Sequence, residues 1–296
     1  MTEERAPSTG GVAVITDTTT AIPDELVDSL KIQMVPYYVN VGNKTLRDVV
    51  DLSRDEFYKW LPDVDKLPTT SNPSAGDYVE AFRNAYQRTR EMVAITMTSL
   101  GSGAYQTATI AKEMILEELP DIKVLIVDSR QVAMAHGWAV IEAAREALAG
   151  ASLLTVGRVA RETAYDAQML QTADTLKYLY MGGRIGRALH LVGSVLRIKP
   201  IISMVDGEIV PAGQARSRLR AYDKMVDLIG RKVGKGARIR VAYMHAAALD
   251  EVSKIRSRVE AEFECVESLV IELSPALGVH TGPGTAGLAY VKVGQK

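Results

Sequence analysis

Glycines and hydroxyl groups are concentrated at residues 99–103, between an apolar run at 92–98 and a helical pattern that begins at 104. Gly101 and Gly103 would let backbone N–H groups approach a ligand, and Ser99 and Ser102 add hydroxyl donors. The first amides of a helix have no partner within it, and the positive end of the helix dipole lies there. The turn could therefore bind a carboxylate or a phosphate. It could equally be an ordinary helix cap that binds nothing, because Ser and Gly are preferred caps.

A second group of hydroxyls lies in the sequence PTTSNPS at residues 68–74. Two prolines hold this segment extended, and Thr69, Thr70 and Ser71 offer their side chains. Polar residues also follow the predicted strands at 17–20 and 128–129. Because ligands of open parallel sheets gather beyond the carboxyl ends of the strands, we expect these clusters to meet. The alternative is a rigid loop whose hydroxyls bond only to nearby backbone.

Two segments of the second half could complete an anion site. Arg184 and Arg187 stand beside glycines in YMGGRIGR at 180–187, and residues 184–220 hold seven Lys or Arg against two acids. Such an asymmetry indicates an anionic ligand or an acidic partner surface, or else a solvated basic face. His280 is predicted to lie in a Gly-Pro loop, VHTGPGT at 279–285. Its imidazole, with an ordinary pKa of about 6.5, could donate to a carboxylate or be merely structural.

Several familiar catalytic patterns are incomplete or missing. The glycines at 101 and 103 are followed by Gln106, so the dinucleotide pattern G-x-G-x-x-G is broken, and no G-x-x-x-x-G-K-[ST] or G-x-S-x-G sequence occurs. The four histidines show no metal-ligand spacing. A single cysteine, Cys265, allows neither an intrachain disulfide nor a thiol cluster for zinc. We therefore expect no metal and no cofactor.

The elements that must position these residues alternate between strand and helix. In the first half, apolar strands are predicted at 12–16, 32–41, 92–98 and 124–127, helices at 24–30, 53–60, 74–87, 104–119, 133–149 and 153–163, and a loop at 62–73. In the second half, strands are predicted at 169–172, 198–204, 208–210, 239–244, 266–273 and 288–293, and helices at 175–180, 217–232 and 249–261. Strands without polar alternation favour a parallel sheet covered by helices on both faces. We expect an α/β domain at 11–165, a second α/β domain with a mixed sheet at 166–296, and a ligand cleft between them.

Composition excludes several classes of protein. The net charge of −1 gives no general attraction to nucleic acid or anionic membranes. No apolar run reaches the ~20 residues that span a bilayer, and the polar, acidic first residues lack the pattern of a signal peptide. We expect a cytoplasmic protein without stable membrane insertion.

Taken together, these stretches resemble the DegV family of fatty-acid-binding proteins. The matching pieces stand in family order along nearly the whole chain: TDTTTAIP at 16–23, TTSNPS at 69–74, SLGSGAYQTA at 99–108, VDSR at 127–130, YMGGRIGR at 180–187, IKPII at 198–202 and HTGPGTAG at 280–287. The family pattern in the central loop is S-S-x-x-S-G-T-Y. Here Thr98 replaces the first Ser and Ala104 replaces the Thr, so one hydroxyl donor is absent.

The resemblance implies a two-domain protein that holds one long-chain fatty acid, such as palmitate or oleate, in a buried tunnel. The resemblance also implies a binding protein that is not an enzyme by itself. In many bacteria such proteins are the lipid-carrying subunit of a fatty acid kinase, whose separate ATP-binding subunit phosphorylates the bound acid. The resemblance places residues in three roles: Thr70, Ser102 and His280 at the carboxylate; Thr69, Ser71, Ser99 and Gly103 at the rim; and Arg184, Arg216 and Arg220 in phosphoryl transfer or partner contact.

Two other functions stay open on the sequence. One is a phosphotransferase or kinase that uses the Gly-Ser turn for phosphate, and the other is a module that binds sugars or small acids in a shallow polar cleft. The sequence does not indicate acyl length, saturation, the residues of the tunnel wall, the kinase partner or the oligomeric state.

Overall fold

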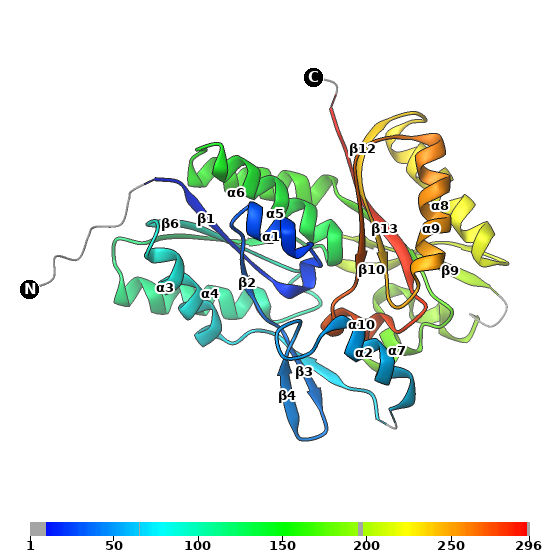
Figure 1. Cartoon of the computed structure of the whole chain (residues 1–296), viewed down its shortest axis with the longest axis horizontal. Coiled ribbons are helices and arrows are strands. Elements are labelled where there is room, and N and C mark those ends of the chain that lie inside the picture. The colour runs from blue at the N-terminus through cyan, green and yellow to red at the C-terminus, as the bar shows by residue number, and fades with distance from the viewer. Residues whose placement is uncertain (1–9, 65, 195–197, 295–296) are drawn as a thin grey trace, which may run out of the picture.

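Four parallel strands form the first sheet, in the spatial order β2-β1-β6-β7 (Figure 1). The structure is a computed structural model that describes residues 10–64, 66–194 and 198–294. The strands are β1 (Val12–Asp17), β2 (Gln33–Val35), β6 (Glu91–Thr96) and β7 (Lys123–Asp128). Buried apolar residues run through these strands without alternation because helices cover both faces of the sheet. The predicted parallel sheet is confirmed.

Helices α3 (Ala75–Tyr86) and α4 (Ala104–Glu118) cover one face of this sheet, and α5 (Ala133–Leu148) and α6 (Leu153–Asp166) cover the other. Helix α3 begins with a capping box, in which the Ser74 hydroxyl accepts from Asp77 N–H and the Asp77 carboxylate accepts from Ser74 N–H. A short helix, α1 (Asp24–Ser29), follows the 3-10 turn η1 (Thr18–Thr20). These caps and apolar faces are the local signals from which the helices were predicted.

Six strands form the second sheet, in the order β10-β9-β8-β13-β11-β12. Strands β11 and β12 pair in parallel, and the other neighbours pair antiparallel. The strands are β8 (Gln168–Thr172), β9 (Lys199–Val205), β10 (Glu208–Ala215), β11 (Arg238–His245), β12 (Glu264–Glu272) and β13 (Ala286–Lys292). The predicted hairpin turn is confirmed: Asp206 and Gly207 both have positive φ, as a two-residue hairpin between β9 and β10 requires. Helices α8 (Arg218–Val233) and α9 (Leu249–Glu262) cover the outer face.

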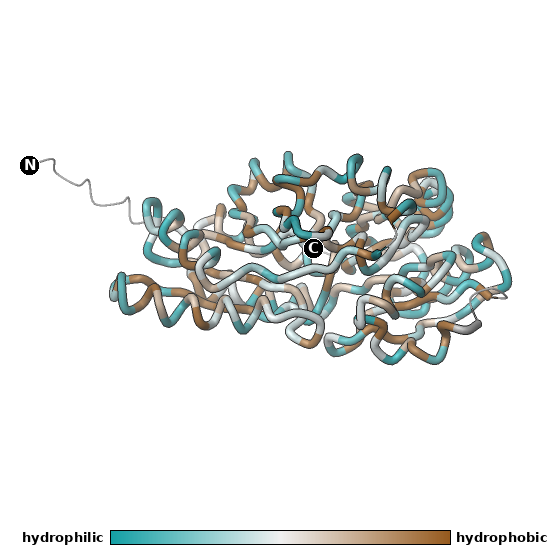
Figure 2. The backbone as a smooth tube through the Cα atoms, turned by 90° about the horizontal axis from the view of Figure 1, so that it is seen from below, coloured by the Kyte–Doolittle hydropathy of each residue, from teal (hydrophilic) through white to brown (hydrophobic). Residues whose placement is uncertain are grey.

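Helix α5 lies between the two sheets, because it packs on β1 and also on β13. Its residues are buried on nearly all sides, and Trp138 donates its indole N–H to the carbonyl of Ala289 in β13 at 3.2 Å. One continuous hydrophobic core therefore joins the two halves of the chain. The outer helices show the opposite pattern, alternating between hydrophilic and hydrophobic residues along their turns (Figure 2). The expected two-domain α/β architecture with a mixed second sheet is confirmed.

A small antiparallel sheet, β4-β3-β5, differs from the prediction. Residues 32–41 were expected to form one strand, but Pro36 ends β2 and the chain continues as β3 in another sheet. The predicted loop at 62–73 contains the 3-10 turn η2 (Leu61–Asp63) and strand β5. The remaining strands are β3 (Tyr38–Val41), β4 (Lys44–Arg47) and β5 (Thr69–Ser71), and the remaining helical elements are α2 (Arg54–Trp60), α7 (Lys177–Met181), η3 (Gly186–Ser194) and α10 (Pro275–Thr281).

Candidate functional site

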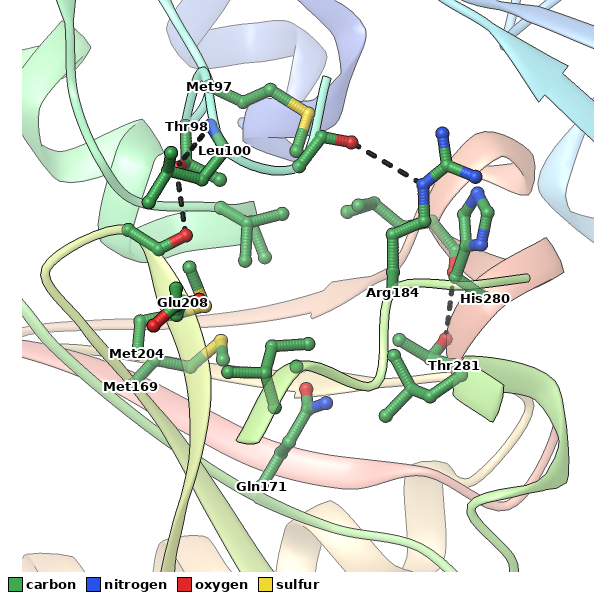
Figure 3. A pocket seen from close by; sticks show the side chains of 18 of the residues that line it. Met97, Thr98, Leu100, Met169, Gln171, Arg184, Met204, Glu208, His280 and Thr281 are labelled. Atoms are coloured by element: carbon green, nitrogen blue, oxygen red, sulfur yellow. Dashed lines mark hydrogen bonds between the residues drawn. The ribbon is translucent and has the colours of Figure 1, made fainter. Parts of the chain in front are cut away.

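A cavity of about 350 Å³ lies between the two sheets (Figure 3). The first half contributes the end of β6 and the turn after it, together with the start of α5, and the second half contributes β8, β9, β10, α7 and α10. The lining is mostly apolar: Met97, Leu100, Val132, Ala133, Met169, Leu179, Met204, Ile209, Leu273 and Leu277. Its polar members are Thr98, Gln171, Arg184, Glu208, His280 and Thr281. A volume in the range of ~300–1,000 Å³ and a few polar groups in an apolar wall are typical of small-molecule sites.

Helix α10 positions His280, which was predicted to lie in a loop. The sequence encodes the helix locally, since Ser274 caps it through Leu277 N–H, Pro275 occupies its first turn and Gly282, with φ of 74°, ends it. Gly278 lets the helix approach α2 closely, because a Cβ there would lie 2.4 Å from the Phe57 ring. His280 therefore stands in the last turn of a short, tightly packed helix and not in a flexible loop.

Thr70 and His280 are joined by a hydrogen bond of 2.7 Å between Oγ1 and Nε2. Side chains alternate along β5, so Thr70 faces α10 while Thr69 and Ser71 are exposed on the opposite face. The Ser71 hydroxyl accepts instead from the side-chain amide of Asn40 at 3.0 Å. The structure thus brings one predicted carboxylate residue, Thr70, to the cavity-lining His280, and it does not bring Thr69 and Ser71 there.

The Gly-Ser turn contacts the cavity through Leu100 and Gly101, whereas Ser102 is not part of the lining. The Ser102 hydroxyl is 2.5 Å from the phenol oxygen of Tyr37 and accepts from Ala104 N–H at 3.2 Å. Ser99 is exposed, and its N–H donates to Asp128. Gly103 permits close contact with Asn72, since a Cβ there would lie 2.9 Å from the Asn72 amide oxygen.

Most amides of this turn already have acceptors. Thr98 N–H donates to Gln131, Gly101 N–H to the Thr98 carbonyl, and Leu100 N–H to the Thr98 hydroxyl. The turn therefore has fewer free backbone N–H groups for a phosphate than its glycines suggest.

Arg184 is exposed and lines the cavity, where its side chain lies beside His280 (Figure 3). Its guanidinium donates to the carbonyls of Gly182 at 2.7 Å and Gly101 at 3.4 Å, so it links the loop after α7 to the Gly-Ser turn. Arg216 and Arg220 are exposed and do not line this cavity. Of the seven predicted basic residues, Arg197 lies outside the described residues, and Arg187, Lys199 and Arg218 pair with acids. The excess of basic residues at 184–220 is thus partly explained by ion pairs within the protein.

Burial sets the charge of the groups around the cavity. It lowers the pKa of His280 to about 4, with a further contribution from nearby Arg184, so the imidazole is neutral at pH 7. The Nδ1 atom of His280 is buried and has no hydrogen-bond partner among the described residues. Burial also raises the pKa of Tyr37 well above its ordinary value, so this phenol stays a hydrogen-bond donor. Arg184 therefore has two neutral hydrogen-bonding groups, His280 and Tyr37, in its neighbourhood.

Two buried aspartates hold the surrounding backbone. The Asp17 carboxylate accepts from Met97 N–H at 3.2 Å and so fixes the start of the Gly-Ser turn. The Asp48 carboxylate accepts from the Thr18 hydroxyl at 2.6 Å and from Ala276 N–H, at the start of α10, at 2.9 Å. Burial raises the pKa of each to about 6. Asp48 thus connects the first half of the chain to the helix that carries His280.

Three residues of the site were not predicted: Tyr37, Asp48 and Gln171. Tyr37 follows Pro36, and that proline is the one local sign that the chain changes sheets there. Asp48 lies between two short elements and meets α10 only in three dimensions. Gln171 interrupts an apolar strand, MLQT, which could have drawn attention to it.

The described residues contain no group of three or more His, Cys, Asp or Glu side chains that could hold a metal ion. Within the same ranges, every helix is too short or too polar to cross a lipid bilayer.

Comparisons with known proteins agree with this architecture. The sequence profile described as an uncharacterised protein of the DegV family matches residues 11–293. A DegV domain-containing protein of Clostridium perfringens is 33% identical over 281 residues, which cover 95% of this chain and 99% of the relative.

Several solved structures share the fold at over 25% identity. The structure of a DegV family protein from Thermus thermophilus, described for its fatty acid binding, has a TM-score of 0.89 at 27% identity and covers 96% of this chain and 100% of that one. A stearic acid-binding protein from Eubacterium ventriosum has a TM-score of 0.83 at 26% identity, with 95% and 98% covered. With a profile match along nearly its whole length and a relative above 30% identity, this chain belongs to the DegV family.

Proposed function

We propose that this protein binds one long-chain fatty acid in the cavity between its two sheets, with the carboxylate near Arg184, His280 and Thr70. The observation that carries the proposal is a mostly apolar cavity in whose lining the side chains of Arg184 and His280 lie side by side. Similar structures from Thermus thermophilus and Eubacterium ventriosum are described as fatty-acid binding, which supports the same ligand class here.

The energetics favour an acyl ligand. Each CH₂ removed from water contributes about 0.8 kcal/mol, so a sixteen-carbon chain supplies on the order of 10 kcal/mol of apolar driving force. Hydrogen bonds from hydroxyls and amides can then orient the carboxylate without a full salt bridge. Among the described residues, no acidic side chain is ion-paired with Arg184, so its charge remains available to an anion.

The proposal extends to presentation of the acid to a separate ATP-dependent kinase subunit in the cytoplasm. A carboxylate held by neutral donors remains a nucleophile, and Arg184 could neutralise charge that develops on a transferred phosphoryl group. Arg216 and Arg220, exposed at the start of α8, are the proposed contacts with that subunit. The protein would be a binding subunit of that kinase. We place the boundary between its two domains between residues 165 and 166.

Mass spectrometry of lipid extracted from the purified protein tests the ligand. We expect a long-chain fatty acid in the extract, and saturable binding of palmitate or oleate after delipidation. An empty extract together with no binding on titration would refute the proposal.

Substitutions test the placement of the carboxylate. Thr70→Ala combined with Ser102→Ala should weaken palmitate binding about tenfold or more, because the loss of even one hydrogen bond to a charged group costs about 1.5–3 kcal/mol. The matched control is Thr45→Ala, which removes an exposed hydroxyl from β4 of the same small sheet. Unchanged affinity in the double variant would place the carboxylate elsewhere.

A phosphotransferase that uses the Gly-Ser turn is the alternative, and it requires this chain alone to bind ATP. Calorimetric titration with ATP separates the two functions. Because most amides of the turn have acceptors within the protein, we expect no heat of binding.

A further inference from the structure

We infer that Gln171 selects a fatty acid that carries a hydroxyl group on its acyl chain. Gln171 belongs to β8, at the centre of the six-stranded sheet, and only 6% of its surface is exposed. Its side chain points into the cavity (Figure 3). This inference rests on the proposed function and adds a substrate class to it.

The Gln171 amide has no hydrogen-bond partner among the described residues. Its neighbours on the same face of the sheet cannot supply one, because the residues directly across from it are Gly287 on β13 and Ile202 on β9. Gly287 packs tightly on the start of the Gln171 side chain, since a Cβ there would lie 2.6 Å from the Cβ of Gln171. The amide is therefore directed away from the sheet and towards the cavity.

Three other polar side chains of the lining differ from Gln171. Thr98 donates to the carbonyl of Gly207 at 2.9 Å, and Thr281 donates to that of Leu277 at 3.1 Å. Glu208 is half-exposed and pairs with Arg187 at 3.3 Å. Each has a partner within the protein, whereas Gln171 depends on what fills the cavity.

The free-energy cost of leaving the Gln171 amide without a hydrogen-bond partner depends on the ligand. More than ~90% of buried polar groups in proteins are hydrogen-bonded, so an amide that a ligand seals off from water without giving it a partner would be unusual. In an empty cavity, water can serve Gln171. A plain acyl chain expels that water and leaves the amide unpaired, which opposes binding.

A hydroxyl on the chain restores the missing partner. The glutamine side chain has a carbonyl acceptor and two N–H donors, and a hydroxyl both donates and accepts. Sites with a buried hydrogen-bonding group reject analogues that lack the matching hydroxyl, because the protein group is then left unpaired. The rest of the wall near Gln171, including Met169 and Met204, remains suited to methylene groups.

Calorimetric titration of the delipidated protein with stearate and with monohydroxystearates, each hydroxylated at a different chain position, tests this inference. We expect at least one monohydroxystearate to bind about tenfold more tightly than stearate. In Gln171→Leu, which keeps the volume but removes the amide, stearate should bind more tightly than in the native protein and the preference should disappear.

Leu170→Met is the control, because Leu170 is on the opposite face of β8, in the core beneath α8 and α9, and the swap conserves volume. It should leave the preference unchanged. Equal hydroxystearate-to-stearate ratios in the native protein and Gln171→Leu would overturn the role of Gln171 while leaving fatty acid binding intact. Failure of the native protein to bind any of the acids would overturn the proposed function as well.

Discussion

Gly182→Ala is a small change that should displace His280. The native backbone at Gly182 has φ of −75° and ψ of −6°, a helical conformation that alanine adopts readily. A Cβ at this position, however, would lie only 2.2 Å from His280 Nδ1. Since non-bonded heavy atoms pack at about 3.5–4.0 Å, the imidazole must move by at least about 1 Å.

That movement has two expected consequences. The 2.7 Å hydrogen bond between Thr70 and His280 should break, at a cost of about 0.5–1.5 kcal/mol. Overpacking of α10 against the loop after α7 should cost about 1–3 kcal/mol of unfolding free energy. Fatty acid affinity should fall roughly tenfold if His280 contacts the carboxylate as proposed. Thermal unfolding and calorimetric titration with palmitate measure the two effects.

A double-mutant cycle identifies the cause. In a His280→Ala background the clash is absent, so Gly182→Ala should cost little and its effect on affinity should vanish. Gly230→Ala in α8 is the matched control, because the nearest side chain there is 3.8 Å from the added Cβ. An equal loss of affinity from Gly182→Ala with and without His280 would refute the steric argument.

Three further predictions concern the contacts around the cavity. Thr98→Val should keep the shape of the side chain but lose the hydrogen bond to the Gly207 carbonyl, at a cost of about 1 kcal/mol. Faster hydrogen exchange in the β9–β10 hairpin checks this, and unchanged exchange contradicts it. Asp48→Ala should destabilise the protein by about 1–3 kcal/mol, because the Thr18 hydroxyl and Ala276 N–H lose their buried acceptor. Urea unfolding measures this loss of unfolding free energy, which should be smaller in Asp48→Asn. His280 should titrate near pH 4 in the free protein, and its pKa should rise when a fatty acid binds, since a nearby carboxylate stabilises the protonated ring. The fatty acid should then bind more tightly as the pH falls towards the raised pKa. NMR titration of the imidazole with and without ligand measures both pKa values, and equal values would contradict the prediction.

The layers of the fold were predictable because their signals are local. The strands of the first sheet are uninterrupted apolar runs, and Ser53, Ser74 and Ser152 each cap a helix through a residue three positions later. Helix α10 carried the same kind of signal, a Ser-Pro start and a glycine end, yet its short length made the segment resemble a loop. The position of His280 in the site depends on how α10 packs against α2 and α7, which a sequence pattern does not reveal.

The site itself was only partly predictable, because its residues meet through pairing of distant segments. Thr70 reaches His280 because β5 pairs with β3, which fixes the face that each threonine occupies. A loop interpretation of residues 69–71 gives no physical reason to separate the three hydroxyls, and only the family resemblance singled out Thr70. Strand alternation supplies that reason. Tyr37 and Asp48 depend in the same way on contacts with Thr18, whose hydroxyl accepts from Tyr37 N–H and donates to Asp48.

The charge balance beside Arg184 follows from these contacts. His280 is neutral because burial and Arg184 both lower its pKa, so a bound carboxylate would face one cation and several neutral donors. Arg184 is held by backbone carbonyls and not by an acid, and it therefore keeps its net charge. A fatty acid carboxylate bound in this way is oriented without a buried ion pair. Such an ion pair would lower the basicity of the carboxylate oxygens. That combination agrees with the proposed function, in which the protein holds a fatty acid by its chain and leaves the carboxylate able to react.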